Sequence, residues 1–220
     1  MVQVIKTHYI MASYLITFGV IMDALDGTIA RLTKTESGFG MQLDSLVDAV
    51  TFGLAPGIMI YQWGFQGLDI QFGQIIGFIY LSAGVIRLAR FNVYHEAKAF
   101  PSNIFVGLPI PLAALAVLSF VLVIETPLQE NSHTLFFGAY VLVIAFLMVS
   151  NIKYRTLKKL KSRYNLWALF FLAAVIALSI KYPSYAIPIL TMLYLISPLF
   201  FSLSGRLKKR KKKVTVEQDT

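Results

Sequence analysis

Seven apolar runs dominate the sequence and limit the folds that it can adopt. They lie near residues 9–30, 45–63, 73–92, 104–124, 134–151, 165–181 and 184–203. A helix of this length can cross the roughly 30 Å hydrocarbon layer of a bilayer. The 220 residues are 57% hydrophobic and only 14% charged, well outside the range of soluble domains. The sequence therefore predicts an all-α, polytopic transmembrane bundle of about seven spans.

Basic residues occur in alternate connections between these runs. All Lys and Arg residues except Lys6 and Lys181 lie near 31–39, 87–103, 152–164 and 205–213. Because cytoplasmic loops carry an excess of Lys and Arg, we expect these connections to face the cytosol. The net charge of +9 then reflects membrane topology, and the basic residues do not form the face that nucleic-acid binding would need.

We expect one domain followed by a tail. Residues 1–204 are interpreted as the transmembrane domain, and residues 205–220 as a basic, disordered cytosolic tail. The tail suits anionic lipid head groups, although a plain topology signal is the alternative interpretation. The chain has no Cys, which excludes disulfides and thiolate metal sites. The sequence thus predicts a multi-pass protein of the cell membrane.

Four aspartates lie in or beside the first two apolar runs: Asp23, Asp26, Asp44 and Asp48. An ionised Asp at bilayer depth costs at least about 2.5 kcal/mol, so such residues are rare and usually functional. The first two are three residues apart and the last two are four apart, so each pair shares one helix face. If the second helix folds back antiparallel against the first, the two pairs converge.

Four converging carboxylates require more positive charge than Arg31 alone can supply. Ligation by oxygen alone suits Mg²⁺, Mn²⁺ or Ca²⁺ rather than Zn²⁺, and Mg²⁺ usually completes its shell with water and substrate phosphates. Gly27, Ala30 and Gly40 are small enough to let a ligand approach the backbone, although helix packing is the alternative role for such residues. Arg31 can bind a phosphate through paired hydrogen bonds. The pattern therefore predicts a divalent-metal site for a phosphate-bearing substrate.

The stretch DALDGTIAR (23–31), followed after eight residues by GMQLDSLVD (40–48), resembles the signature of the CDP-alcohol phosphatidyltransferases. The resemblance implies a membrane helical bundle whose four signature aspartates hold a divalent metal, Mg²⁺ or Mn²⁺, with Ca²⁺ able to occupy the site. It also implies transfer of a phosphatidyl group from a CDP-linked lipid to an alcohol, with release of CMP. Members usually carry a helix before the first Asp pair, so we expect the chain to lack the family's first helix.

Four further stretches resemble the phosphatidylserine synthase branch of that family. They are DSLVDAVTFGLAPG (44–57), AGVIRLARFNV (83–93), FVGLPIPLAA (105–114) and LMVSNIKYRTLKK (147–159). The resemblance implies that L-serine attacks CDP-diacylglycerol, or an archaeal CDP-lipid, and yields phosphatidylserine and CMP. The site would lie at the cytosolic boundary, where serine and CMP are soluble. Membrane lipids surround such a protein, and the family analogy implies a homodimer.

The resemblance also implies roles for individual residues. The CDP-lipid would contact Asp23, Asp26, Gly27, Ala30, Arg31 and Gly40. A serine hydroxyl is a weak nucleophile without a base, so we expect Asp48 to accept its proton, with Asp44 as the alternative base. For the acceptor, the candidates are Arg87, Arg90 and Asn92, and one of the two arginines could hold the serine carboxylate. Anchoring a helix end among head groups is the alternative role for these arginines.

Two other functions compete with serine transfer. The same chemistry could use glycerol phosphate, inositol phosphate or choline as the acceptor, against which the stretches GLPIPLAA and RLARFNV argue. The aspartates could instead line the path of a divalent-metal transporter. A transporter would not require the spaced small residues and the arginine between the two Asp pairs.

Overall fold

The computed structural model describes the chain except residues 6, 34–36, 69, 97–103, 156–183 and 199–220. Its helices are α1 (Val2–Ile5), α2 (Tyr9–Thr33), α3 (Gly38–Asp48), α4 (Ala55–Gly64), α5 (Ile70–Glu96), α6 (Ile110–Ile124) and α7 (Asn131–Val149). A π-helical segment, η1 (Ala49–Leu54), joins α3 to α4, and a further helix spans Ser184–Pro198. Two short strands, β1 (Ile104–Val106) and β2 (Lys153–Arg155), pair antiparallel.

The helical bundle confirms the predicted fold class. Within the described residues, four helical stretches are long and apolar enough to cross a membrane: Tyr9–Gly27, Gly38–Gly64, Ile70–Tyr94 and Asn131–Val149. They match four of the predicted runs, and two shorter apolar helices, Ile110–Ile124 and Ser184–Pro198, lie within two more. The predicted span near 165–181 and the tail 205–220 lie outside the described residues. The chain is a helical membrane protein.

One predicted span is wrong at its start. The run near 104–124 does not begin as a helix, because β1 occupies its first residues and α6 starts only at Ile110. Gly107 has a φ of +79°, a left-handed conformation that favours glycine. Pro109 then forms the N-cap of α6 with an extended backbone. These two residues turn the chain from the strand into the helix.

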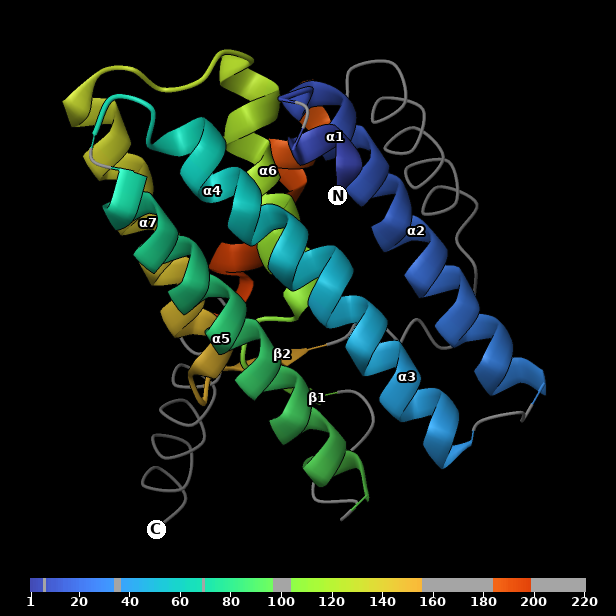
Figure 1. Cartoon of the computed structure of the whole chain (residues 1–220). Helices are drawn as coiled ribbons and strands as arrows, with labels where there is room; N and C mark the ends of the chain where they lie inside the picture. The colour runs from blue at the N-terminus through green and yellow to red at the C-terminus, as the bar shows by residue number, and fades with distance from the viewer. Residues whose placement is uncertain (6, 34–36, 69, 97–103, 156–183, 199–220) are drawn as a thin grey trace, which may run out of the picture.

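The elements gather around α6. This helix contacts α2, α4, α5, α7 and η1, and most of its residues are buried. Figure 1 shows the end of α2, the start of α3, the end of α5 and both strands toward one end of the bundle. The helix Ser184–Pro198 is the orange-red element behind the front helices (Figure 1). The fold therefore brings the end of α2, the start of α3 and the end of α5 together at one end of the bundle.

The packing of α4 against α5 depends on a pair of glycines. A Cβ atom at Gly77 would lie 2.4 Å from the carbonyl oxygen of Gly57, and a Cβ atom at Gly57 would lie 3.2 Å from the carbonyl oxygen of Gly77. Small residues allow helix backbones in membranes to approach this closely. The contact holds α5 next to the long helix that carries Asp44 and Asp48.

Candidate active site

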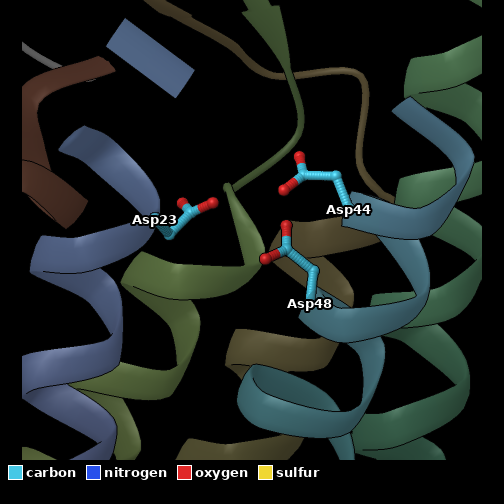
Figure 2. Close-up of side chains that lie close together, drawn as sticks. All are labelled: Asp23, Asp44 and Asp48. Carbon is cyan, nitrogen blue, oxygen red and sulfur yellow. The ribbon is translucent and has the colours of Figure 1, made fainter. Parts of the chain in front are cut away.

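Three of the four predicted aspartates converge at one end of the bundle. Asp23 projects from α2, and Asp44 and Asp48 project toward it from successive turns of α3 (Figure 2). Each offers a carboxylate oxygen within 4.8 Å of the others. Carboxylates this close repel one another unless a cation lies among them. The arrangement is an acidic cluster that can bind a metal ion.

The three aspartates of the cluster differ in how deeply they are buried. Asp48 is only 9% exposed, Asp23 is half-buried, and Asp44 is exposed. The site therefore opens toward Asp44 and closes at Asp48. Asp26 lies one turn after Asp23 with an exposed side chain, outside the group of three, but its charge still acts on Asp44.

The predicted small residues leave the open side accessible. Gly27 and Gly40 are exposed, and a Cβ atom at Gly40 would meet only the Ser37 hydroxyl oxygen, at 3.0 Å. That hydroxyl oxygen caps α3 by accepting a 3.0 Å hydrogen bond from the Gly40 N–H. Ala30 and Arg31 belong to the last turns of α2, and their side chains lie outside the part of the chain that the structure describes.

The helix that carries two of the aspartates changes its winding directly after Asp48. The π-helical segment η1 begins at Ala49, and the Ala55 N–H bonds to the Val50 carbonyl, five residues back. π-helical segments are rare in proteins, and those that occur are often found at functional sites. The sequence analysis did not predict it, although Pro56 four residues after Phe52 was a signal that the α-helical hydrogen bonding is interrupted there.

A hydrogen-bonded joint ties α3 to α5 beside the cluster. The Asn92 amide donates to the Ser45 hydroxyl at 3.0 Å and to the Gln42 side-chain oxygen at 3.3 Å. The Ser45 hydroxyl also lies 3.3 Å from the Asn92 amide oxygen. Asn92 is buried. These bonds occupy its amide and favour a positioning role for Asn92, rather than direct contact with an acceptor.

Arg87 lies on α5, and its buried guanidinium has no hydrogen-bond partner among the described residues. The residue is 6% exposed, and its Nε atom is buried without a hydrogen-bond partner. Within the described residues, Arg87 makes no hydrogen bond or ion pair, and its closest ring contact places Cζ 5.3 Å from the centroid of Phe91. Among charged groups, Asp48 acts on it most strongly. A buried cation is costly unless it is hydrogen-bonded, so the unfilled donor among the described residues makes Arg87 a candidate for binding an anion.

Arg90, one turn later, is fully engaged. Its guanidinium donates to the carbonyl oxygens of Val106, Met148, Val149 and Ser150 at 2.7 to 3.2 Å and lies 3.4 Å from the Asn151 side-chain oxygen. These bonds join α5 to β1 and to the end of α7. The structure therefore separates two arginines that the sequence analysis treated alike, and it favours Arg87 for contact with an acceptor.

Comparisons with known proteins identify the family of this chain. Residues 1–150 match a model of the CDP-alcohol phosphatidyltransferase family. The chain is 37% identical over 196 residues to the CDP-diacylglycerol–serine O-phosphatidyltransferase of Helicobacter pylori strain J99, which covers 86% of this chain and 78% of the relative. It is 36% identical over 140 residues to a Methanocaldococcus jannaschii protein of the same name (64% and 61% covered), and 35% identical over 147 residues to the archaetidylserine synthase of Methanothermobacter thermautotrophicus (65% and 57%).

Proposed function

Because this chain belongs to the CDP-alcohol phosphatidyltransferase family, we propose that it transfers a phosphatidyl group from CDP-diacylglycerol to the hydroxyl of L-serine. The products are phosphatidylserine and CMP. The names of its relatives support serine as the acceptor. The observation that carries the chemistry is the convergence of the Asp23, Asp44 and Asp48 carboxylates within 4.8 Å at one end of the bundle.

The donor set fits a divalent cation. Oxygen ligands on two helices suit Mg²⁺ or Mn²⁺, and Ca²⁺ can occupy the same ligands. Asp23, Asp44 and Asp48 would hold the metal, with Asp26 one turn beyond Asp23 as the fourth predicted ligand. A bound divalent cation supplies charge stabilisation for the diphosphate and for the CMP leaving group.

The buried end of the cluster suits the acceptor hydroxyl. In the reaction, the serine oxygen forms a bond to the phosphorus that carries diacylglycerol, and the bond from that phosphorus to the CMP oxygen breaks. The Asp48 carboxylate accepts the hydroxyl proton, which makes the oxygen nucleophilic. Asp44 is the alternative base, but its side chain is exposed, whereas that of Asp48 is buried.

The two substrates occupy opposite sides of the cluster. CDP-diacylglycerol contacts the open side of the cluster, where Asp23, Asp26, Gly27 and Gly40 lie, and Ala30 and Arg31 stay predicted contacts from the family signature. The serine carboxylate pairs with the guanidinium of Arg87, whose lack of any partner in the described structure supports this role. Asn92 holds α3 in position, and Arg90 stabilises the loops next to Arg87.

The charge pattern supports a location for this chemistry. We place the protein in the cell membrane, with the acidic cluster and the basic tail on the cytosolic side, because the basic connections follow the positive-inside bias. The acyl chains of the donor then lie among membrane lipids. By family analogy the protein forms a homodimer.

The test is CMP release by the purified, detergent-solubilised protein. CDP-diacylglycerol and Mn²⁺ or Mg²⁺ are supplied with and without L-serine, and Asp48→Asn and chelator serve as negative controls. Serine-dependent release that both controls abolish supports the proposal. CMP release with glycerol phosphate, inositol phosphate or choline, but not with serine, would assign that alcohol as the acceptor. Absence of release together with metal uptake by reconstituted vesicles would favour transport.

A further inference from the structure

The helix Ser184–Pro198 lies within the predicted run 184–203 and carries no predicted site residue, yet its packing fixes it against the centre of the bundle. The hydroxyl oxygens of Thr191 on this helix and Ser119 on α6 lie 3.1 Å apart, and both residues are buried. A hydrogen bond between buried hydroxyls fixes the rotation of the helix about its axis. Tyr194 lies three residues after Thr191, so it shares the helix face that meets the bundle.

Tyr194 is held in place by a second aromatic side chain. Its ring stacks on the ring of Tyr154 in β2, with centroids 5.4 Å apart and planes 13° apart. Tyr154 is only 1% exposed, so one face of the Tyr194 ring packs against a buried side chain. Tyr194 itself is only partly buried, and within the described residues no hydrogen bond of its hydroxyl group is found.

The stacked pair of Tyr154 and Tyr194 lies next to the side of the site where the acceptor is proposed to bind. In the strand pair, Tyr154 of β2 is opposite Phe105 of β1, and the carbonyl oxygen of the next residue, Val106, accepts a hydrogen bond from Arg90. Arg90 is one turn from Arg87 on α5. Each of Tyr194 and Arg87 is among the groups whose electrostatic field acts on the other. The stacked ring of Tyr154 and the strand pair therefore connect Tyr194 to the part of α5 that carries Arg90 and Arg87.

We propose that Tyr194 helps to select the acceptor: its hydroxyl donates a hydrogen bond to the carboxylate that Arg87 holds. The inference rests on the proposed function, which supplies the carboxylate-bearing acceptor. Among the described residues, the buried Arg87 Nε atom has no partner and the Tyr194 hydroxyl makes no hydrogen bond, so an anion between them would satisfy both. A carboxylate accepts several hydrogen bonds and suits this pair of donors. Tyr194 is thus a specificity residue contributed by a helix outside the family signature.

The test uses Tyr194→Phe, which removes only the hydroxyl and keeps the ring that stacks on Tyr154. We expect the KM for L-serine to rise about tenfold, the effect of losing one hydrogen bond to a charged group. The kcat and the KM for CDP-diacylglycerol should change less than twofold. Preference for serine over ethanolamine, which lacks the carboxylate, should fall by the same factor as serine binding. Phosphatidylserine and phosphatidylethanolamine are quantified separately after each reaction.

A matched control is available on the same helix. Tyr185→Phe makes the same substitution at a residue that is 67% exposed, and it should leave both KM values unchanged. A double-mutant cycle with Arg87→Lys adds a second readout, because two groups that bind one carboxylate should show non-additive effects on serine KM.

Three results would overturn the inference. One is an unchanged serine KM in Tyr194→Phe, and another is an equal loss for both substrates, which would indicate a purely structural role. Additive effects of Tyr194→Phe and Arg87→Lys would also contradict it. These outcomes are distinct from failure of the proposed function, since that failure would appear in the wild-type protein as CMP release that does not depend on serine.

Discussion

The hydroxyl of Tyr80 on α5 donates a 3.0 Å hydrogen bond to the carbonyl oxygen of Phe52 in η1. Tyr80 is fully buried, and Pro56, four residues after Phe52, has no N–H to offer that carbonyl. The π-helical winding of η1 sets how the helix face with Asp44 and Asp48 is turned relative to α4. The bond from Tyr80 thus supports the segment that orients two members of the acidic cluster.

Tyr80→Phe should therefore reduce activity more than its effect on stability explains. Loss of one buried hydrogen bond costs about 1 kcal/mol of unfolding free energy. A displacement of catalytic groups by about 1 Å can lower a rate by about 100-fold. A smaller displacement of Asp44 and Asp48 should therefore lower kcat by at least about threefold. Thermal unfolding in detergent and serine-dependent CMP release measure the two effects.

The matched control for this prediction is Tyr140→Phe. The Tyr140 hydroxyl donates to another helix carbonyl, that of Ala116 on α6 at 3.3 Å, instead of to a carbonyl of η1. This variant should lose a similar amount of stability and keep its kcat. Equal losses of kcat in the two variants would show that the Tyr80 bond has no special effect on the acidic cluster.

Metal binding should depend directly on the acidic cluster. Asp48→Asn removes one of three converging carboxylates and keeps the side-chain size. We expect Mn²⁺ affinity to fall more than about tenfold, because even partners outside the ligand shell typically contribute that much. The measurement is free Mn²⁺ by electron paramagnetic resonance during titration of the purified protein, without substrate.

Glu130→Gln provides the control for loss of a carboxylate elsewhere. Glu130 is exposed and lies 3.4 Å from His133 at the start of α7, outside the acidic cluster. Its loss should leave Mn²⁺ affinity unchanged. If both variants bind Mn²⁺ as the wild type does, Asp48 is not a metal ligand, and its role would be limited to proton transfer or structure.

Local sequence patterns predicted most of the bundle, because membrane length and helical periodicity are properties of neighbouring residues. The run near 134–151 corresponds closely to α7 (Asn131–Val149). The same periodicity indicated that Asp23, Asp44 and Asp48 could face one another across a helical hairpin. The strand pair was not predictable in this way, because β1 and β2 are far apart in the sequence and each has only three residues.

The roles of Arg87 and Arg90 could not be separated from the sequence for the same physical reason. Both arginines lie on one helix in a similar apolar context. The difference arises from oxygen atoms that lie 16 to 61 residues from Arg90 along the chain. Only the folded bundle shows that these atoms surround Arg90 and leave Arg87 without a partner among the described residues.

This difference predicts opposite effects of two identical substitutions. Arg90→Lys cannot reproduce a planar fork of donors to several carbonyl oxygens, so it should lower the unfolding free energy by about 2 kcal/mol or more. The protein that remains folded should keep its serine KM. Arg87→Lys should instead raise serine KM at least about tenfold, with a smaller change in the KM for CDP-diacylglycerol.

Steady-state kinetics with each substrate varied in turn, together with thermal unfolding, measure both effects. The assignment of Arg87 would be wrong if its variant changed the two KM values equally. The structural role of Arg90 would be wrong if Arg90→Lys unfolded at the wild-type temperature while serine KM rose.

The glycine contact between α4 and α5 predicts that an added side chain lowers the stability of the bundle. In Gly77→Ala the new Cβ atom would lie 2.4 Å from the carbonyl oxygen of Gly57, closer than such atoms approach, so the helices must separate. Overpacking of this kind typically costs about 1 to 3 kcal/mol. Gly38→Ala places a Cβ atom at the start of α3 with nothing within 4 Å, so it should be tolerated. In detergent, the unfolding temperature of Gly77→Ala should be well below that of Gly38→Ala. Equal unfolding temperatures would mean that α4 and α5 do not pack this closely.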